Sequence, residues 1–277
     1  MKQNLKFYLK NKLTNKELKL VPSSFDVVGD IMIFSDFPKE LAKKEKLIGS
    51  KILENYHHIK TILKKTKKYS GRFRIPKLKI IAGEKRKETI HKENNVLIKL
   101  DVEKVYFSPR MSSERKRIAD LIKPNESVLV MFSGSGVYCL VIAKNTKCKE
   151  AYGIEINPTA HKYTLENIKK NKLENKIKLF LGDVRRVMPK LNKKFDRILM
   201  PLPKGGENFL DLSLKYIKNK GIIHFYDFLH ENEFYKAEEK VRSACKKSKK
   251  EFKILEIVKC GQYSPGFYRV CADFFVD

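Results

Sequence analysis

Four apolar runs in the second half of the chain constrain its fold more than any other feature. They read VLVMFSGSG from residue 128, AYGIEINP from 151, IKLFLGDVRR from 177 and DRILMPLP from 196. Helix-patterned segments such as NPTAHKYTLENIKKNKL lie between them. This alternation is typical of βαβ units, so we expect an α/β domain with a parallel sheet. The expected strands cover residues 127–132, 151–156, 177–181, 195–200, 221–226, 252–259 and 268–276.

The part of the chain before this alternation has a different pattern. SFDVVGDIMIF predicts two short strands around a Gly-Asp turn, and an amphipathic helix follows Asp36. Further β-like runs flank a basic turn near residue 70. We therefore divide the chain into a short N-terminal extension over 1–19, a small α+β domain over 20–112 and the α/β domain over 113–277.

The chain is strongly basic. Lys and Arg number 60 against 32 Asp and Glu, which gives a formal net charge of +28. A field of this sign attracts polyanions such as nucleic acids. The alternative is a lysine-rich surface of the kind found in proteins from hot habitats, where lysine mainly solvates the protein.

Cysteine spacing, histidine spacing and hydropathy exclude several classes of protein. The five cysteines form no CxxC pair and the six histidines show no ligand spacing, so we predict neither a metal site nor a disulfide framework. No apolar run approaches the roughly 18 residues of a membrane span. We expect a soluble, cytoplasmic protein, with a monomer as the default.

The ends of the first three strands of the α/β domain predict a nucleotide site. Gly134 and Gly136 follow Phe132 in a loop where backbone amides can approach a ligand closely. Glu155 is placed to accept hydrogen bonds from ribose hydroxyls, and Asp183 to meet an adenine amino group. The alternatives are an ordinary tight turn and two helix caps. NAD is disfavoured because the spacing GxGxxG is absent.

Two prolines follow the fourth strand directly. Proline has no N–H to donate to a sheet, so Pro201 and Pro203 must lie past the carboxyl end of that strand. That end is where ligands bind in open α/β sheets. We predict that both prolines line the substrate pocket and that Pro201 also contacts the cofactor.

Longer motifs resemble a known family. GRFRIPKLKIIAGEKRKETIHKENNVLIKLDVEKVYFSPRMSSERKRI, the glycine loop, DRILMPLPKGGENFLDLSLKYIKNKGIIHFY and SPGFYRVCADF are similar to the archaeal and eukaryotic tRNA (guanosine-37-N1)-methyltransferases. The resemblance implies S-adenosylmethionine as the cofactor and the tRNA anticodon loop as the partner. It also implies a Rossmann-like class I methyltransferase domain behind the smaller α+β domain.

The resemblance assigns roles to four further residues. It implies that Arg74 faces the guanine O6, that Glu114 is the general base for the N1 proton, and that Tyr106 and Arg110 line the base and cofactor region. This chemistry is consistent, since N1 becomes nucleophilic only as its proton leaves and a cation near O6 stabilises the resulting anion. Without the resemblance, Glu114 reads as a helix-cap carboxylate and Arg74 as a solvated or phosphate-contacting side chain.

A guanine in a stacked anticodon loop must be flipped out before it can react, and contacts to the loop phosphates offset the cost. The densest basic cluster available for such contacts lies beside Tyr69 and consists of Lys64, Lys65, Lys67, Lys68 and Arg72. The alternative interpretation is a solvated turn.

The sequence departs from the family pattern in two places. Pro201 stands where the familiar motif has Asn, which resembles an archaeal subgroup, some of whose members also methylate carbon 7 of 4-demethylwyosine in wyosine biosynthesis. Only some 20 residues precede the small domain, so we expect the family's separate amino-terminal domain to be absent or vestigial. The alternative functions are an aminocarboxypropyl transferase of wyosine biosynthesis and a non-catalytic RNA-binding protein.

Overall fold

The structure is a computed structural model that describes residues 5–277, apart from the side chains of residues 68–70. The chain forms two compact units. The first runs to Lys92 and includes Leu97–Pro109, and the second comprises Glu93–Val96 and Arg110–Asp277. The division after Pro109 falls slightly before the predicted boundary at residue 112.

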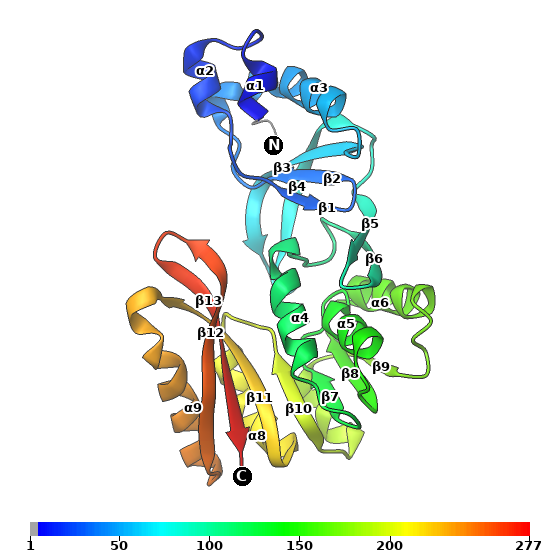
Figure 1. Ribbon diagram of the computed structural model, residues 1–277, viewed down its shortest axis with the longest axis vertical. Coiled ribbons are helices and arrows are strands. Elements are labelled where there is room, and N and C mark those ends of the chain that lie inside the picture. The colour runs from blue at the N-terminus through cyan, green and yellow to red at the C-terminus, as the bar shows by residue number, and fades with distance from the viewer. Residues whose placement is uncertain (1–4) are drawn as a thin grey trace. The chain divides into compact units, whose positions relative to one another are not determined.

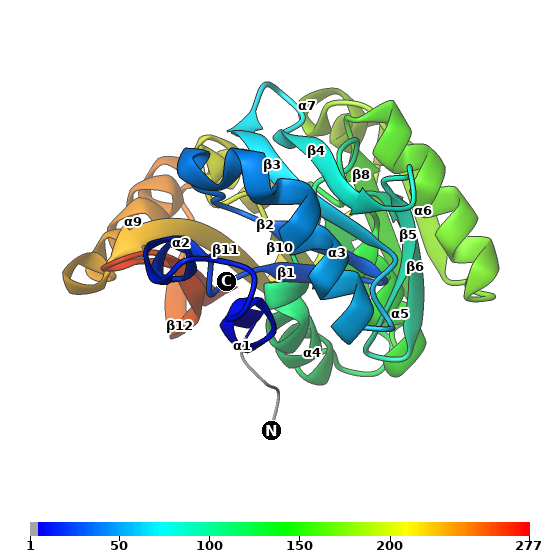
Figure 2. The same ribbon diagram turned by 90° about the horizontal axis from the view of Figure 1, so that it is seen from above.

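The first unit is built around a small sheet. The elements up to residue 101 are α1 (Leu5–Leu9), α2 (Asn15–Leu20), β1 (Asp26–Val28), β2 (Ile31–Phe34), η1 (Lys39–Lys44), α3 (Glu45–Asn55), β3 (Thr61–Ser70), β4 (Ile75–Gly83), β5 (Glu88–Glu93) and β6 (Val96–Asp101). The sheet has the order β1-β2-β3-β4, in which only β2 and β3 are parallel. Helix α3 packs against this sheet (Figure 2), and β5 and β6 form a separate two-stranded sheet.

The start of the chain belongs to the core of the first unit. The sequence prediction separates residues 1–19 as an extension, but Leu5, Leu9 and Leu13 are buried in the same apolar cluster as Phe34. These three leucines recur every fourth residue, so they occupy one side of the chain where it is helical. The described part of this segment therefore packs as an integral layer of the first unit.

The second unit is an α/β domain (Figure 1). Its elements are η2 (Pro109–Met111), α4 (Ser112–Asp120), β7 (Ser127–Val130), α5 (Val137–Asn145), β8 (Glu150–Glu155), α6 (Pro158–Lys170), β9 (Ile177–Leu181), α7 (Val184–Val187), η3 (Met188–Leu191), β10 (Phe195–Met200), η4 (Gly206–Phe209), α8 (Leu210–Tyr216), β11 (Ile217–His230), η5 (Glu231–Glu233), α9 (Tyr235–Ser248), β12 (Phe252–Ser264) and β13 (Phe267–Val276). The expected Rossmann-like α/β fold is confirmed.

The sheet of the second unit has the order β12-β13-β11-β10-β7-β8-β9. Strands β7 to β11 are parallel, and β13 runs antiparallel to both of its neighbours. Helices α5 and α6 cover one face of the sheet and α8 and α9 cover the other (Figure 1). Strand β11 continues to His230 and β12 to Ser264, further than predicted, because a continuous β11–β13 ladder supplies backbone partners where the apolar pattern ends.

The parallel strands bring their carboxyl ends to one edge of the sheet. The chain order reverses between β7 and β10, which are neighbours in the sheet. A reversal of this kind opens a crevice at the carboxyl ends of the strands, where α/β proteins bind ligands. The fold therefore places the predicted nucleotide loop at a ligand-binding edge.

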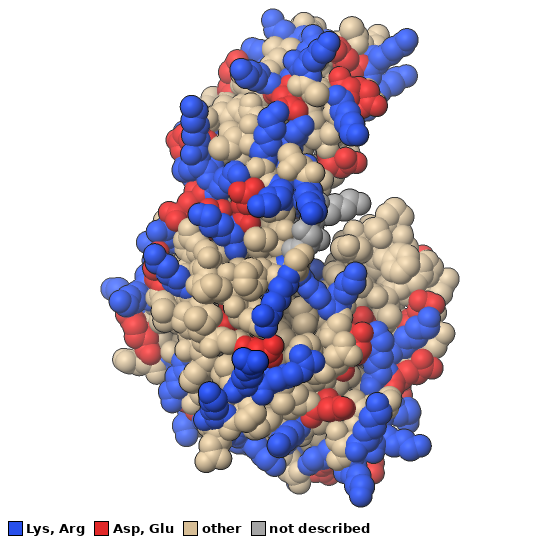
Figure 3. Space-filling view, turned by 180° about the vertical axis from the view of Figure 1, so that it is seen from behind, with Lys and Arg blue, Asp and Glu red and all other residues tan. Residues whose placement is uncertain are grey.

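Lys and Arg are spread over the surface seen in Figure 3, with Asp and Glu among them. The basic charge therefore does not gather in a tail. Within residues 5–277, no helix has the length and apolar character needed to cross a bilayer.

Candidate active site

The loop between β7 and α5 is shaped by two glycines. Gly134 and Gly136 have φ angles of 56° and 72°, in the left-handed region that glycine tolerates best. A Cβ on Gly136 would lie 2.1 Å from Cγ2 of Thr164 in α6, so a larger residue does not fit without movement. The loop therefore has the form expected where backbone amides approach a ligand.

Two serine hydroxyls of the same loop are buried. Ser133 and Ser135 are 3% and 1% exposed, and neither Oγ atom has a hydrogen-bond partner within the described part of the chain. Buried hydroxyl groups in proteins are normally hydrogen-bonded. A cofactor that carries hydroxyl, amino and carboxylate groups would satisfy them, so the loop fits a polar nucleoside such as S-adenosylmethionine.

Glu155 at the end of β8 is held by backbone amides. Its Oε2 accepts from Gly134 N at 2.6 Å and its Oε1 from Asn157 N at 2.7 Å. Burial raises the pKa of this carboxyl group, and the hydrogen bonds from the backbone N–H groups oppose the rise. The cap of α6 is Asn157, whose side chain accepts from Thr159 and Ala160, so Glu155 is not the helix cap. Its contact with ribose hydroxyls stays a prediction.

Asp183 follows β9 and begins α7. Its Oδ1 accepts from Arg185 N at 2.9 Å, so the side chain caps the helix, as the alternative interpretation expects. Gly182 N donates to Glu155 O at 2.8 Å, which places the two acidic strand ends side by side. A contact between Asp183 and an adenine amino group stays a prediction.

Phe132 packs against Phe209, which in turn contacts Arg185, and sequence reasoning missed both of these side chains. Its ring lies edge to face with that of Phe209, with centroids 5.0 Å apart, and the Arg185 guanidinium lies 4.0 Å from the Phe209 centroid. The three residues follow β7, β10 and β9, so their side chains gather along the carboxyl edge. An apolar ring wall of this kind suits a purine face. In the sequence, the only signal for this group of side chains is the position of Arg185, two residues after the predicted site residue Asp183.

The chain turns sharply after β10. Leu202 N donates to Met200 O at 2.7 Å, a three-residue turn centred on Pro201. The parallel ladder ends with Met200 opposite Phe225, and Pro203 beyond it is buried. The expectation that both prolines lie past the end of the strand is confirmed. Their contacts with base and cofactor stay predictions.

Glu114 in α4 lies in a buried hydrogen-bonded cluster. Its Oε1 accepts from Tyr226 Oη at 2.6 Å and Arg117 Nη2 at 2.8 Å, and its Oε2 accepts from Arg117 Nε at 2.7 Å. Tyr138 Oη donates to Tyr226 Oη at 3.1 Å, and burial raises the pKa of both phenols. The start of α4 at Met111 has no side-chain cap, so Glu114 serves side-chain partners instead of the helix end.

The cluster around Glu114 continues into the sheet as a chain of ion pairs and hydrogen bonds. Arg117 Nη1 donates to Asp273 Oδ2 at 2.6 Å, Asp273 Oδ1 lies 2.6 Å from His224 Nδ1, and His224 Nε2 lies 2.8 Å from Arg197 Nη1. Burial lowers the pKa of His224, which favours the neutral ring. Burial alone would raise the pKa of Asp273, but the bonds from His224 and Arg117 outweigh it and hold that pKa well below its usual range.

Three side chains of this chain have the composition of a metal site. His224, Cys271 and Asp273 place one ligand atom each within 4.8 Å of one another. Arg197 bonds to His224 and Arg117 bonds to Asp273, so a cation there would face two guanidinium groups. We therefore interpret the trio as part of the ion-pair chain.

The four residues assigned by family resemblance divide between the units. Arg74 and Tyr106 lie in the first unit, and Arg110 and Glu114 in the second. Arg74 ends the β3–β4 turn with φ of 50°, and its N donates to Gly71 O at 3.2 Å. A non-glycine residue at positive φ is strained, and such positions cluster at functional sites. That these side chains meet at one base stays a prediction.

Lys64 differs from the rest of the predicted basic cluster. Its ammonium group bonds to the carboxylate of Glu45 and lies 5.3 Å from the centre of the Phe37 ring, and its side chain is only 16% exposed. Because Glu45 neutralises this charge inside the first unit, Lys64 is poorly placed to contact phosphate. No local pattern indicates this pairing, since Glu45 lies 19 positions before Lys64 in the sequence.

The other members of the basic cluster lie closer to solvent. Lys65 donates to Ser35 Oγ at 3.2 Å, whereas Lys67 and Arg72 are exposed. The side chain of Lys68 lies outside the described residues. Lys67 and Arg72 are therefore the candidates that the structure leaves best placed for phosphate contacts.

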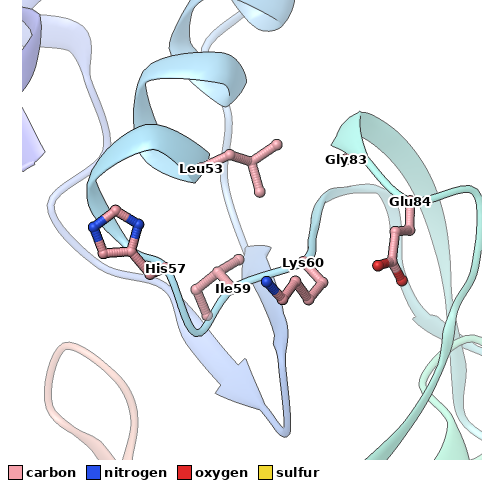
Figure 4. Close-up of a pocket in the computed structure, with 6 residues that line it drawn as sticks. All are labelled: Leu53, His57, Ile59, Lys60, Gly83 and Glu84. Carbon is pink, nitrogen blue, oxygen red and sulfur yellow. The ribbon is translucent and has the colours of Figure 1, made fainter.

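The first unit also has an open hollow of about 430 Å³ (Figure 4). Its lining consists of Leu53, His57, Ile59, Lys60, Gly83 and Glu84. None of the predicted site residues lies in it. Its charged groups are one lysine and one glutamate on the rim, so we assign it no chemistry.

Two family models match the chain. The TRM5/TYW2 methyltransferase domain matches residues 89–255, and the TYW2 N-terminal domain matches residues 5–86. The second match includes most of the segment that the sequence analysis treats as an extension. Most of this match falls on the small α+β domain, so the expectation that the family's separate amino-terminal domain is absent or vestigial stays a prediction.

Three curated relatives cover most of the chain. It is 38% identical over 259 residues to "tRNA (guanine(37)-N(1))-methyltransferase Trm5b" of Pyrococcus abyssi, which covers 93% of this chain and 76% of the relative. It is 36% identical over 269 residues to "tRNA (guanine(37)-N(1))/4-demethylwyosine(37)-methyltransferase Taw22" of Nanoarchaeum equitans, with shares of 79% and 87%. It is 36% identical over 250 residues to "tRNA(Phe) (4-demethylwyosine(37)-C(7)) aminocarboxypropyltransferase" of Methanocaldococcus jannaschii, with shares of 90% and 96%.

Solved structures give the same result. A complex of aTrm5 with tRNALeu matches with a TM-score of 0.87 at 34% identity, covering 100% of this chain and 79% of that one. M. jannaschii TYW2 in complex with AdoMet matches with a TM-score of 0.71 at 30% identity, covering 92% and 99%. The family model spans more than half of the sequence, and the resemblance seen in the motifs is confirmed. The chain belongs to the TRM5/TYW2 methyltransferase family.

Proposed function

We propose that the protein transfers the methyl group of S-adenosylmethionine to N1 of the guanosine at position 37 of tRNA. The cofactor, when bound, supplies an electrophilic methyl group on a sulfonium ion. The protein residues hold the cofactor, orient the base and take up its N1 proton. We expect the reaction to need no metal ion and the protein to act as a monomer.

The glycine loop is the proposed cofactor site. Gly134 and Gly136 present backbone amides to the cofactor, and Glu155 accepts hydrogen bonds from its ribose. The hydroxyls of Ser133 and Ser135 bind other polar groups of the cofactor.

The adenine side of the proposed cofactor site is lined by Phe132 and Phe209. Asp183 lies at the adenine amino group. Arg110 and Pro201 lie at the rim of the site, toward the base.

Glu114 is the proposed general base. Its Oε2 accepts one hydrogen bond, from Arg117 Nε at 2.7 Å, and a carboxylate oxygen has a further lone pair for the N1 proton. The N1–H bond breaks toward this oxygen while the N1–CH₃ bond forms, and the sulfonium leaves as a neutral thioether. Arg74 offsets the negative charge that develops on O6.

The remaining predicted residues hold the RNA. Tyr106, Pro201 and Pro203 line the flipped guanine, and Lys67, Arg72, Lys65 and Lys68 contact phosphates of the anticodon loop. Supporting this partner, a relative in the family has been solved with tRNALeu. The observation that carries the proposal is the glycine loop with its buried, unpartnered serine hydroxyls on a chain 38% identical to Trm5b.

A second function has its own support. The N-terminal model that matches residues 5–86 is that of TYW2, and the chain covers 96% of the M. jannaschii aminocarboxypropyltransferase. The same cofactor would then donate its aminocarboxypropyl group to carbon 7 of 4-demethylwyosine. The name of Taw22 raises a third possibility, methylation of both guanosine and 4-demethylwyosine at position 37.

One experiment separates these activities. The protein is incubated with S-adenosylmethionine and tRNA that carries guanosine, adenosine or 4-demethylwyosine at position 37, and the digested nucleosides are identified by mass spectrometry. We expect N1-methylguanosine from the first tRNA and no product from the adenosine control. A methylated 4-demethylwyosine would add the third activity.

The by-product gives an independent readout. Methyl transfer releases S-adenosylhomocysteine, whereas aminocarboxypropyl transfer releases methylthioadenosine. Methylthioadenosine together with an aminocarboxypropyl adduct, and no methylated guanosine, would replace our proposal with the TYW2-type function. Binding of S-adenosylmethionine without any product from the three tRNAs would favour a non-catalytic RNA-binding protein.

A further inference from the structure

The end of β11 lies beside the turn of the β12–β13 hairpin (Figure 1). Aromatic side chains from these strands contact one another there. We call this group the aromatic face, and it consists of Phe228, His230, Tyr263, Phe267 and Arg269. Tyr263 is 66% exposed and Phe267 is 43% exposed. None of these residues was used in the proposed chemistry.

The aromatic face continues the side of the sheet that carries Glu114. Alternate residues of a strand point to the same side, so Tyr226, Phe228 and His230 of β11 line one face. Cross-strand pairing places Arg269 opposite Phe228 and Phe267 opposite His230. Tyr226 also donates a hydrogen bond to Glu114.

The aromatic face begins close to the contact between Tyr226 and Glu114. Residues that share a face of a strand lie about 7 Å apart, so the aromatic face begins one such step beyond the hydroxyl contact with Glu114. The step runs toward the carboxyl end of β11, the edge at which the glycine loop and Pro201 lie. A base held at Glu114 therefore has its sequence neighbours within reach of the aromatic face.

The aromatic face is preformed. The rings of Phe228 and Tyr263 lie with centroids 4.3 Å apart, and those of His230 and Phe267 5.2 Å apart. The hairpin tip is tied to the end of β11, since Glu231 N donates to Gly266 O at 2.9 Å. The rings are therefore fixed without a ligand, which lowers the entropy cost of binding one.

A cation accompanies the rings. The Arg269 guanidinium lies 5.1 Å from the Phe228 centroid. Lys259 Nζ lies 3.4 Å from the Tyr268 centroid, but Tyr268 pairs with Leu229 and so lies on the opposite side of the sheet. The acidic neighbours Asp227 and Glu233 are paired with Lys240 and Lys236, which leaves Glu231 as the remaining carboxylate of this turn. Exposed rings interleaved with cations are the form of surface on which unpaired nucleotides stack.

We propose that the aromatic face binds unpaired nucleotides of the substrate RNA next to the flipped base, with Tyr263 as the stacking residue. The inference rests on the proposed function for the identity of the RNA and goes beyond it in naming the surface. The chain's net charge of +28 favours a polyanion over a cationic protein segment as the occupant.

The test compares Tyr263→Ala with Tyr235→Ala, which removes another exposed tyrosine, 56% exposed at the start of α9. Each full-length variant is titrated with a tRNA anticodon stem-loop and with a fully paired duplex of the same length. We expect Tyr263→Ala to weaken stem-loop binding about tenfold, to leave duplex binding within twofold, and to keep S-adenosylmethionine affinity unchanged. Tyr235→Ala should match the wild type.

The kinetic arm separates this inference from the proposed function. In methyl transfer, Tyr263→Ala should raise KM for tRNA about tenfold while kcat stays near the wild-type value. Equal stem-loop affinity for the two variants, or equal losses for stem-loop and duplex, would overturn the inference even if the wild type methylates guanosine. If the wild type transfers no methyl group, the proposed function fails, and the stem-loop titration still decides the role of Tyr263.

Discussion

Two buried glutamates of the second unit, Glu155 and Glu114, are held by different kinds of partner. The carboxylate of Glu155 accepts from backbone N–H groups, among them those of Gly134 and Asn157. The carboxylate of Glu114 accepts from a guanidinium and a phenol, those of Arg117 and Tyr226. One site uses neutral dipoles that the fold fixes in place, and the other uses a chain of opposite charges.

Because their partners differ, the two glutamates should affect different properties of the protein when they are changed. Among the described residues no cation is paired with Glu155. Burial raises its pKa, and the carboxylate gains from further donors such as ribose hydroxyls. Glu114 has a compensating cation, and Arg117 links it to Asp273, 156 positions along the chain. Changes at Glu155 and its loop should therefore affect cofactor binding first, whereas changes in the Glu114 cluster should affect both turnover and folding.

The largest effect is expected from Glu114→Gln. An amide cannot take up the N1 proton, so kcat should fall by about 10² to 10⁴, equivalent to about 3–5 kcal/mol of the barrier. The affinities for tRNA and S-adenosylmethionine should stay within a fewfold of the wild type. Single-turnover methyl transfer and equilibrium binding measure the two quantities, and Glu256→Gln on an exposed position of β12 is the matched control. Comparable losses in turnover and RNA affinity would remove the role of Glu114 as base.

The next effect is on folding, in Arg117→Met. Its removal leaves the buried carboxylates of Glu114 and Asp273 without their shared cation, which should lower the free energy of unfolding by about 3 kcal/mol. Arg242→Met is the control, because Arg242 forms an exposed pair with Glu238 and should lose under about 1 kcal/mol. Urea denaturation compares them. Similar losses in the two variants would mean that the buried chain contributes little to stability.

A smaller effect is expected from Gly136→Ala in the glycine loop. The new Cβ would meet Thr164 at 2.1 Å, so we expect a loss of about 2 kcal/mol in unfolding free energy together with weaker S-adenosylmethionine binding. Gly71→Ala is a matched control, since Gly71 has φ of 71° and no described atom within 4 Å of its Cβ. It should lose only the cost of the backbone angle, about 1 kcal/mol. Calorimetric titration and thermal unfolding would show whether the two glycines differ.

The smallest effect is on the pH dependence of cofactor binding. The raised pKa of Glu155 means that acidification protonates it early, and a protonated carboxyl accepts more weakly from ribose, so affinity should fall severalfold as the pH is lowered from 7 toward 5. The pKa of Asp273 is lowered, so its contribution to stability is present above the unfolded-state value of about 3.9 and is lost only below it. Circular dichroism should therefore stay native over this range. An affinity that does not change between pH 7 and 5 would contradict the carboxylate role of Glu155.

Much of the α/β architecture was predictable from local pattern. The strands 177–181 and 195–200 were predicted with the bounds of β9 and β10, because a buried parallel strand reads as an apolar run between helix signals. The glycine loop and the prolines past β10 were also predictable from local sequence, because glycine and proline affect the conformation of their own backbone. Lys64, by contrast, was assigned to RNA although Glu45 holds it, and nothing near Lys64 in the sequence indicated that pairing.

The sequence by itself determined where the strands of the α/β domain lie along the chain, the glycine loop after the first of them and the net basic charge, whereas the order of the strands in the sheet came from the structure. Only the tertiary structure decided that Leu5 belongs to a core, that Glu114 shares its cation with Asp273, and that Phe228 and Tyr263 stack. The physical reason is the separation along the sequence between the residues that interact. Strand, turn and cap preferences depend on neighbouring residues, whereas ion pairs and ring contacts depend on segments that meet only after the sheet has formed.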